Sequence, residues 1–252
     1  NDLFRLLEET GEMPVTAAPS AGDFAELYRK LAQDDPAILS IHMSSGLSAP
    51  ANVANDAKEM VPEINVTVVD TKTLSAVLGC QVMAAVHAAR AGWDKSRIIT
   101  MIQQINTVSE SIYTIDDLTY LIHGGRIGHM KGLIASVLHL RPLIRVEKEG
   151  GTYQQAGMSR TVKGALTGLI KYVQERHPPG SRLRTQLGHG YNPKAIAFLR
   201  ERMDALYDCV WMPTTQLTTM MSAHTGPTMV GIAFASEADL PPFFRELPIY
   251  QS

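Results

Sequence analysis

The sequence predicts a protein of two α/β domains, and three observations lead to that prediction. Two short apolar runs rich in branched residues, Ala37–Met43 and Ile64–Asp70, are typical of buried parallel strands. Each run is followed by a stretch of helical composition, which favours a doubly wound, mostly parallel sheet with crossover connections. From about Arg141 the pattern changes to a hairpin and then a β-α-β unit, which predicts a second, smaller domain with a mixed sheet.

The remaining elements follow in order along the chain. Ser20 and Asp23 form a capping-box pattern that begins a helix over Ala21–Gln33. Further helices are predicted over Leu74–Arg90, Ser96–Val108, Thr161–Arg176 and Pro193–Met203, and strands over Ile112–Ile115, Pro142–Glu147, Thr152–Ala156, Arg184–Gly188, Cys209–Met212 and Met229–Ala235. The pattern switches near Gly124–Gly125, so we expect domains over residues 1–122 and 123–252 with a ligand site between them.

The overall composition excludes several classes of protein. Of 252 residues 45% are hydrophobic and 19% charged, and the formal net charge is −2. No basic stripe is present, which argues against nucleic-acid binding. No apolar run is long enough to span a bilayer, and the acidic, amphipathic start of the chain is not a signal peptide. Cys80 and Cys209 lie far apart in apolar contexts, so we expect buried thiols and a cytoplasmic location.

A double serine follows the first predicted strand, in the segment Ser44–Ser48. In open α/β sheets, ligands collect at the carboxyl ends of strands, where loop hydroxyl and backbone N–H groups point outward. Two serines and Gly46 at that place suit an anionic oxygen. The competing interpretation is a helix cap, because serine before a helix is a common N-cap residue.

Three other loops offer polar groups to a ligand. Pro14 and Pro19 fix an extended segment that presents Thr16. The segment Gly124–Gly128 carries Arg126, whose forked guanidinium suits a carboxylate or phosphate, but it lacks the lysine of a phosphate-binding loop. His224 precedes a Gly-Pro turn. The histidines and the two cysteines show no metal-ligand spacing, so we expect no metal site.

Taken in order, six segments resemble the motifs of the DegV family of bacterial fatty-acid-binding proteins. The family patterns are Thr-Ser-Gln-Pro-Ser, Ser-Ser-Gly-Leu-Ser-Gly, a strand ending in Asp-Ser/Thr, Tyr-Leu-x-x-Gly-Gly-Arg-Ile, Arg-Thr-x-x-Lys-Ala and His-Thr-Gly-Pro-Gly. Here they stand as Thr16–Ser20, Ser44–Ala49, Asp70–Thr71, Tyr120–Ile127, Arg160–Ala165 and His224–Thr228. A single motif of this kind carries little weight, but six in order make chance a poor explanation.

The resemblance implies a carrier, not an enzyme, that encloses a long-chain fatty acid in a tunnel between two domains. The implied ligand-binding residues are Thr16, Ser44, Ser45, Gly46, Arg126, His224, Thr225 and Gly226, with the choice between Ser44 and Ser45 open. The implied partner is a separate ATP-dependent kinase that converts the bound acid to an acyl phosphate and docks near Arg160. We expect no cofactor besides the bound acid, no membrane insertion and a monomer.

The chain departs from the family pattern at four places. Ala17–Ala18 replaces Ser-Gln, Ala49–Pro50 replaces Gly-Thr, and Thr228 replaces the last glycine. Because glycine often occupies positions of positive φ, Thr228 predicts an altered turn. Family members also carry an N-terminal strand ahead of the segment that matches Asn1–Pro14, so either that strand is missing from this sequence or the first sheet is built differently here.

A fatty acid needs an apolar lining and donors for its carboxylate. Each buried methylene contributes about 0.8 kcal/mol, and methionine adapts to irregular apolar shapes. Lining candidates are Met158, Met212, Met220, Met221, Met229 and the run Gly132–Leu138.

The main alternative is a serine hydrolase with Ser44 or Ser45, His224, and Asp70 or Asp116, although the Gly-x-Ser-x-Gly elbow is absent. A phosphoryl-transfer enzyme would need a Walker lysine or a metal-binding acidic cluster, and neither is present in the sequence. A lipid-sensing scaffold without a kinase partner stays open.

Overall fold

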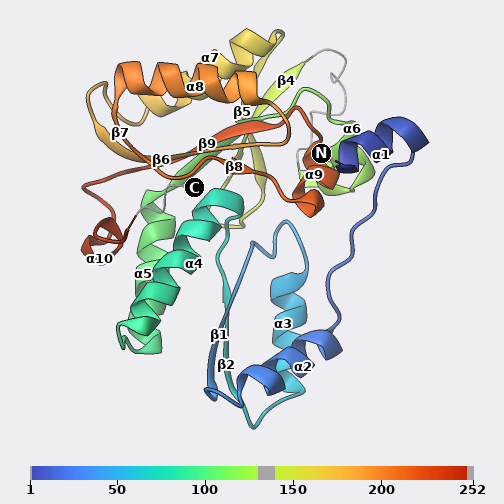
Figure 1. Cartoon of the computed structure of the whole chain (residues 1–252), viewed down its shortest axis with the longest axis vertical. Helices are drawn as coiled ribbons and strands as arrows, with labels where there is room; N and C mark the ends of the chain where they lie inside the picture. Colours follow the sequence, from blue (N-terminus) through green and yellow to red (C-terminus); the bar gives the residue numbers. More distant parts are fainter. Residues whose placement is uncertain (1, 130–139, 249–252) are drawn as a thin grey trace. The chain divides into compact units, whose positions relative to one another are not determined.

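The computed structural model describes residues 2–129 and 140–248 (Figure 1). These residues divide into two compact units. Unit 1 comprises Asn1–Thr16, Val108–Val146 and Tyr153–Ser252, and unit 2 comprises Ala17–Thr107 and Glu147–Thr152. The expected boundary between residues 122 and 123 falls inside unit 1, because β3 (Glu110–Thr114) pairs with strands from much later in the chain.

Unit 2 is built around a two-stranded parallel sheet with helices before, between and after its strands. Its elements are α2 (Ala21–Leu31), β1 (Ala37–His42), α3 (Pro50–Glu59), β2 (Asn65–Asp70), α4 (Ser75–Arg90) and α5 (Lys95–Val108). The strands pair from Ala37 opposite Asn65 to His42 opposite Asp70. Both strand ends therefore lie at one edge, where the Ser44–Ser48 loop begins. The predicted parallel strands and the helices of this segment are confirmed.

The core of unit 2 depends on small residues in its helices. Ala25 and Tyr28 of α2 pack with Ala57 of α3 and with Ile38 and Val66 of the two strands, all buried. Because alanine takes little space, α3 can lie close to α2 and the sheet. The predicted capping box of α2 is also present: the Ser20 hydroxyl accepts from the Asp23 N–H, and the Asp23 carboxylate accepts from the Ser20 N–H.

Unit 1 contains a seven-stranded mixed sheet in the order β5-β4-β3-β9-β6-β7, with β8 also paired to β6. The strands are β3 (Glu110–Thr114), β4 (Arg141–Val146), β5 (Tyr153–Ser159), β6 (Arg182–His189), β7 (Asp208–Trp211), β8 (Thr215–Gln216) and β9 (Val230–Ser236). The predicted hairpin is confirmed as the antiparallel pair β4–β5, and the predicted β-α-β unit as parallel β6 and β7. The prediction that the mixed-sheet part is the smaller one is wrong, since unit 1 comprises more of the chain.

β3 corrects the sequence interpretation most clearly. We expected this strand to belong with the parallel strands of the first domain, but it lies between β4 and β9 and is antiparallel to both. Its last three residues are buried, as expected for a strand with neighbours on both sides. A short apolar run predicts burial but does not identify its partners, so its position in the sheet was not predictable.

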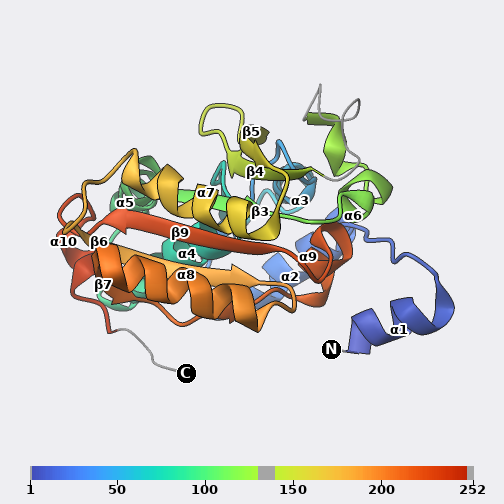
Figure 2. The same cartoon turned by 90° about the horizontal axis from the view of Figure 1, so that it is seen from above.

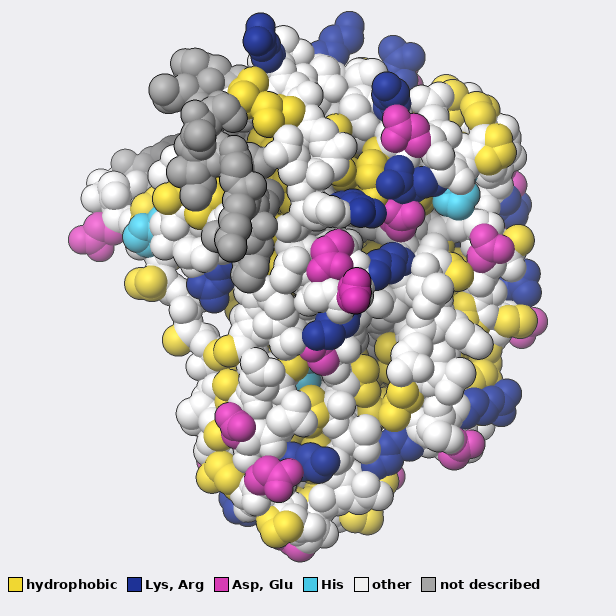
Figure 3. Space-filling view, turned by 180° about the vertical axis from the view of Figure 1, so that it is seen from behind, with side chains coloured by type: hydrophobic (Ala, Val, Ile, Leu, Met, Phe, Trp, Pro, Cys, Tyr) yellow, Lys and Arg dark blue, Asp and Glu magenta, His cyan; other side chains and the backbone are white. Residues whose placement is uncertain are grey.

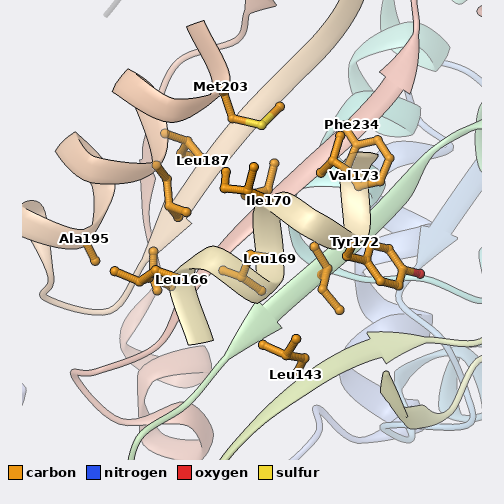
Figure 4. Packing of buried hydrophobic residues seen from close by; sticks show 14 of the residues in the cluster. Leu143, Leu166, Leu169, Ile170, Tyr172, Val173, Leu187, Ala195, Met203 and Phe234 are labelled. Atoms are coloured by element: carbon orange, nitrogen blue, oxygen red, sulfur yellow. The ribbon is translucent and has the colours of Figure 1, made fainter. Parts of the chain in front are cut away.

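Helices α7 (Val162–Gln174) and α8 (Pro193–Leu206) lie side by side over one face of this sheet (Figures 1 and 2). Leu166, Leu169, Ile170 and Val173 recur at helical spacing along α7. They belong to one buried hydrophobic cluster that also contains residues of α8 and the strands (Figure 4). The other helices of unit 1 are α1 (Asp2–Thr10), α6 (Thr119–His123), the 3₁₀ turn η1 (Arg126–His129), α9 (Thr219–Thr225) and α10 (Pro242–Arg245).

Three compositional expectations can be compared with the structure. Among the described residues, no helix is long and apolar enough to cross a membrane. On the face shown in Figure 3, basic and acidic side chains are interspersed, without a basic stripe. Cys80 and Cys209 form no disulfide and are of intermediate burial, and burial raises the pKa of Cys209 to about 11.

Candidate functional site

The loop after β1 is closed by Ser44. This residue is fully buried, and its N–H donates to the Thr73 carbonyl at 2.8 Å. Its hydroxyl accepts from the Gly46 N–H at 3.1 Å, and its carbonyl accepts from the N–H groups of Leu47 and Ser48. The helix-cap interpretation is wrong here, because α3 begins after Ala49 and has no side-chain cap. The serines therefore build a loop rather than a helix start.

Ser45 belongs to a polar cluster with Asp70 and Lys72. Its N–H donates to Asp70 Oδ1 at 3.1 Å, and its hydroxyl donates to Asp70 Oδ2. Lys72 Nζ lies 2.7 Å from Asp70 Oδ2 and 3.2 Å from Ser45 Oγ. Burial alone would raise the pKa of Asp70, but the hydrogen bonds from Lys72 and Ser45 outweigh it and lower that pKa. Asp70 is therefore ionised at neutral pH and holds both partners.

The tip of the β4–β5 hairpin packs against the serine loop within unit 2. A Cβ atom on Gly46 would lie 2.4 Å from the Gly150 carbonyl oxygen, and one on Gly151 would lie 2.0 Å from Ser44 Oγ. Gly151 also has φ of +68°. Glu147 supports the turn by accepting from the N–H groups of Glu149, Gly150 and Thr152. Sequence reasoning found the hairpin but not this role, because nothing in the local pattern indicates what a turn will contact.

Unit 1 brings Thr16 and His224 together across 208 residues of sequence. Thr16 Oγ1 and His224 Nε2 are 2.7 Å apart. His224 lies near the end of α9 rather than in the loop that the sequence suggested. Its Nδ1 atom is buried without a hydrogen-bond partner among the described residues. The His224 imidazole therefore has one nitrogen hydrogen-bonded to Thr16 and one without a hydrogen-bond partner among the described residues.

The Gly124–Gly125–Arg126 segment lies beside this histidine. A Cβ atom on Gly124 would be 2.2 Å from His224 Nδ1, so only glycine fits there. Arg126 donates through Nη1 to the Gly124 carbonyl. Burial, together with the neighbouring Arg126 and His123, lowers the pKa of His224. The imidazole is therefore neutral at pH 7, with a guanidinium nearby.

Thr225 and Gly226 have structural positions in the same motif. The Thr225 hydroxyl donates to the Met221 carbonyl inside α9. Gly226 has φ of +69°, and a Cβ atom there would lie 2.6 Å from the ring of Tyr120. The expected change of the turn at Thr228 stays a prediction, and Thr228 does not adopt positive φ. Instead its hydroxyl accepts from the Asp116 N–H at 3.1 Å.

The remaining predicted residues vary in accessibility. Arg160 is exposed just before α7, and Met158 and Met220 are also exposed. Met212 and Met229 are buried, as expected for core residues or lining. The apolar run Gly132–Leu138 lies outside the described residues.

Among the described residues, the polar groups do not form a hydrolase relay within either unit. Asp70 bonds directly to Ser45, and Asp116 pairs with Arg141 at 2.8 Å. His224 is bound to Thr16 rather than to an orienting carboxylate. In the described part of the chain, no three His, Cys, Asp or Glu residues are grouped so as to hold a metal ion.

Comparisons with known proteins identify the family. The family profile described as "Uncharacterised protein, DegV family" matches residues 1–237. A DegV domain-containing protein from Deinococcus radiodurans is 32% identical over 225 residues, which cover 89% of this chain and 78% of that protein. The chain belongs to the DegV family.

Solved DegV structures share its fold. A DegV family protein from Thermus thermophilus, described as binding fatty acid, matches with a TM-score of 0.81 and 26% identity over 93% of this chain and 83% of its own. A DegV lipid-binding protein from Thermotoga maritima matches with a TM-score of 0.79 and 26% identity over 93% and 81% of the two chains. The resemblance inferred from the six motifs and the α/β fold class are thereby confirmed.

Proposed function

We propose that this DegV protein binds one long-chain fatty acid and acts as a carrier rather than an enzyme. The observation that carries the proposal is the Thr16–His224 pair beside Arg126, since it combines a hydroxyl, an imidazole and a cation in one partly buried place. Relatives at 26% identity are described as fatty-acid-binding and lipid-binding proteins, which supports the same ligand class.

The proposed head-group contacts follow from which atoms carry a proton and can donate a hydrogen bond. A hydroxyl has one proton, so Thr16 can donate to a carboxylate only if it accepts from His224 Nε2–H. In that tautomer Nδ1 is the unprotonated nitrogen. Arg126 supplies the positive charge that a buried carboxylate requires, because burying an unpaired ion is very costly.

Ser44 is a better head-group donor than Ser45. The Ser45 hydroxyl already donates to Asp70 and accepts from Lys72, so a ligand would have to displace Asp70. The Ser44 hydroxyl accepts from the Gly46 N–H, and it donates no hydrogen bond to any described residue. We therefore propose that Ser44 donates to the head group, while Ser45 fixes the loop and an apolar tunnel takes the tail.

The proposal extends to a partner. An acid whose carboxylate is held but not transformed needs a second protein to use it, and ATP-dependent phosphorylation would give an acyl phosphate. We propose that a separate kinase docks at exposed Arg160 and that the protein works in the cytoplasm as a monomer. A pull-down of the kinase separates this carrier from a lipid-sensing scaffold.

Mass spectrometry of lipid that copurifies with the native protein tests the ligand. Wild type should retain a long-chain acid, and Thr16→Val and Ser44→Ala should each weaken retention roughly 10- to 100-fold, because each removes a hydrogen bond to a charged group. Ser45→Ala should weaken lipid retention less, and the double variant Ser44→Ala/Ser45→Ala should retain the least lipid. Thr100→Val, which removes a hydroxyl bonded only within α5, is the control.

Two results would count against the proposal. Equal lipid content in wild type, Thr16→Val and the double serine variant would exclude these residues as head-group ligands. Turnover of an activated ester with a covalent serine adduct would favour the hydrolase instead.

A further inference from the structure

A chain of hydrogen bonds runs from the last motif of unit 1 to the segment that carries Arg160. It begins at Thr228, where the family pattern has glycine. The Thr228 hydroxyl accepts from the Asp116 N–H at 3.1 Å, and its carbonyl lies 3.4 Å from Asn192 Nδ2. A glycine there would have no hydroxyl, so the contact with Asp116 depends on this substitution.

Arg141 continues the chain from Asp116. Arg141 Nε donates to Asp116 Oδ1 at 2.8 Å, and Arg141 Nη1 donates to the Arg160 carbonyl at 3.0 Å. About a quarter of each paired side chain, Arg141 (24%) and Asp116 (25%), is exposed, so solvent only partly screens the pair. One guanidinium therefore joins a carboxylate after β3 to a backbone carbonyl after β5.

The segment around Arg160 is held locally as well. The Ser159 hydroxyl donates to the Thr161 carbonyl at 3.0 Å, and the Thr161 hydroxyl accepts from the Gly164 N–H, which caps α7. Arg141 pairs with Ser159 across β4 and β5. The backbone at Arg160 is thus fixed from two sides while its side chain stays exposed.

We propose that Thr228, Asp116 and Arg141 are positioning residues that hold the backbone of Arg160 in a fixed place relative to the His224–Thr228 turn. This inference rests on the proposed function, in which that turn binds the head group and Arg160 meets the partner. A partner that binds Arg160 and must also reach the carboxylate of the bound acid benefits from a constant distance between Arg160 and that carboxylate. The fork of Arg141 is essential, because the ammonium of lysine cannot reproduce its two fixed N–H directions.

Hydrogen exchange of the intact protein tests the inference. In Arg141→Lys, exchange of the amides at residues 157–164 should be roughly three- to tenfold faster, the effect of losing a charge-assisted bond that is partly exposed. Thr228→Gly should accelerate exchange of the Asp116 amide and, to a smaller extent, of residues 157–164. Arg145→Lys is the matched control, since Arg145 lies on the same strand but binds Gln154.

Two further measurements separate positioning from general stability and from ligand binding. In Arg141→Lys, exchange in the paired strands β6 and β9 and the fatty-acid dissociation constant should both stay within about twofold of wild type. Equal exchange at residues 157–164 in the Arg141→Lys and Arg145→Lys variants would overturn the inference, and so would a loss of fatty-acid affinity as large as the change in exchange. Failure of wild type to bind any fatty acid would instead overturn the proposed function and leave the exchange result standing.

Discussion

At the scale of single residues, glycines decide how closely the polar loops approach. Gly151 has positive φ and lies directly against Ser44 Oγ, the oxygen that we propose binds the head group. The family motifs pointed to Thr16, His224 and Arg126, and the structure brings Thr16 and His224 into hydrogen-bond distance. They did not point to Lys72 or Gly151, because a lysine after a strand and a glycine in a turn are common in any sequence.

Gly151→Ala should destabilise unit 2 more than Gly92→Ala does. Both glycines have positive φ, +68° and +77°, so alanine is strained at each, by about 1 kcal/mol. Only at Gly151 would the new Cβ atom collide, because Gly92 has open space around it. Urea denaturation measures the difference, and equal midpoints for the two variants would show that the hairpin tip does not press on Ser44.

At the scale of elements, prediction succeeded where the local pattern was sufficient. The apolar runs gave β1 and β2, helical composition and the glycine and proline stops gave α4 and α7, and the Gly-Gly turn gave the β4–β5 hairpin. The position of β3 could not be obtained in this way, since its pairing with β4 and β9 depends on side chains far along the chain. Short elements such as α9 and β8 have too few residues for a periodic signal.

The start of α7 offers a test at this scale. The Thr161 hydroxyl accepts from the Gly164 N–H at 3.0 Å and so satisfies a donor that the helix leaves unpaired. Thr161→Ala should lower the free energy of unfolding by about 0.5–2 kcal/mol, whereas Thr161→Ser should retain most of it. Thermal denaturation of both variants distinguishes them, and equal losses would mean that the methyl group rather than the hydroxyl matters.

At the scale of the whole molecule, partly buried imidazoles predict how stability changes with pH. Burial is the main cause that lowers the pKa values of His42, His189 and His224. The unfolded chain therefore binds protons first as the pH falls, so stability that is complete above about pH 6.5 is lost as the pH drops through the folded pKa values. Asp70, whose pKa is also lowered, adds a further loss below about pH 4.

Chemical denaturation between pH 7.5 and pH 5 should show the histidine contribution as a falling midpoint. His42→Gln should show a smaller fall, because one of the three groups is gone. A midpoint that rises on acidification in wild type would contradict this assignment of neutral, partly buried imidazoles.

The hairpin tip at Glu147–Thr152 has a consequence for how the protein can be dissected. It belongs to unit 2 although its two strands belong to unit 1. A fragment ending at residue 107 would keep both serines, Asp70 and Lys72 but would lack the glycines that cover them. Truncating the chain between α5 and β3 therefore does not give a complete unit 2. A recombinant unit 2 would need residues 147–152 attached through an engineered linker.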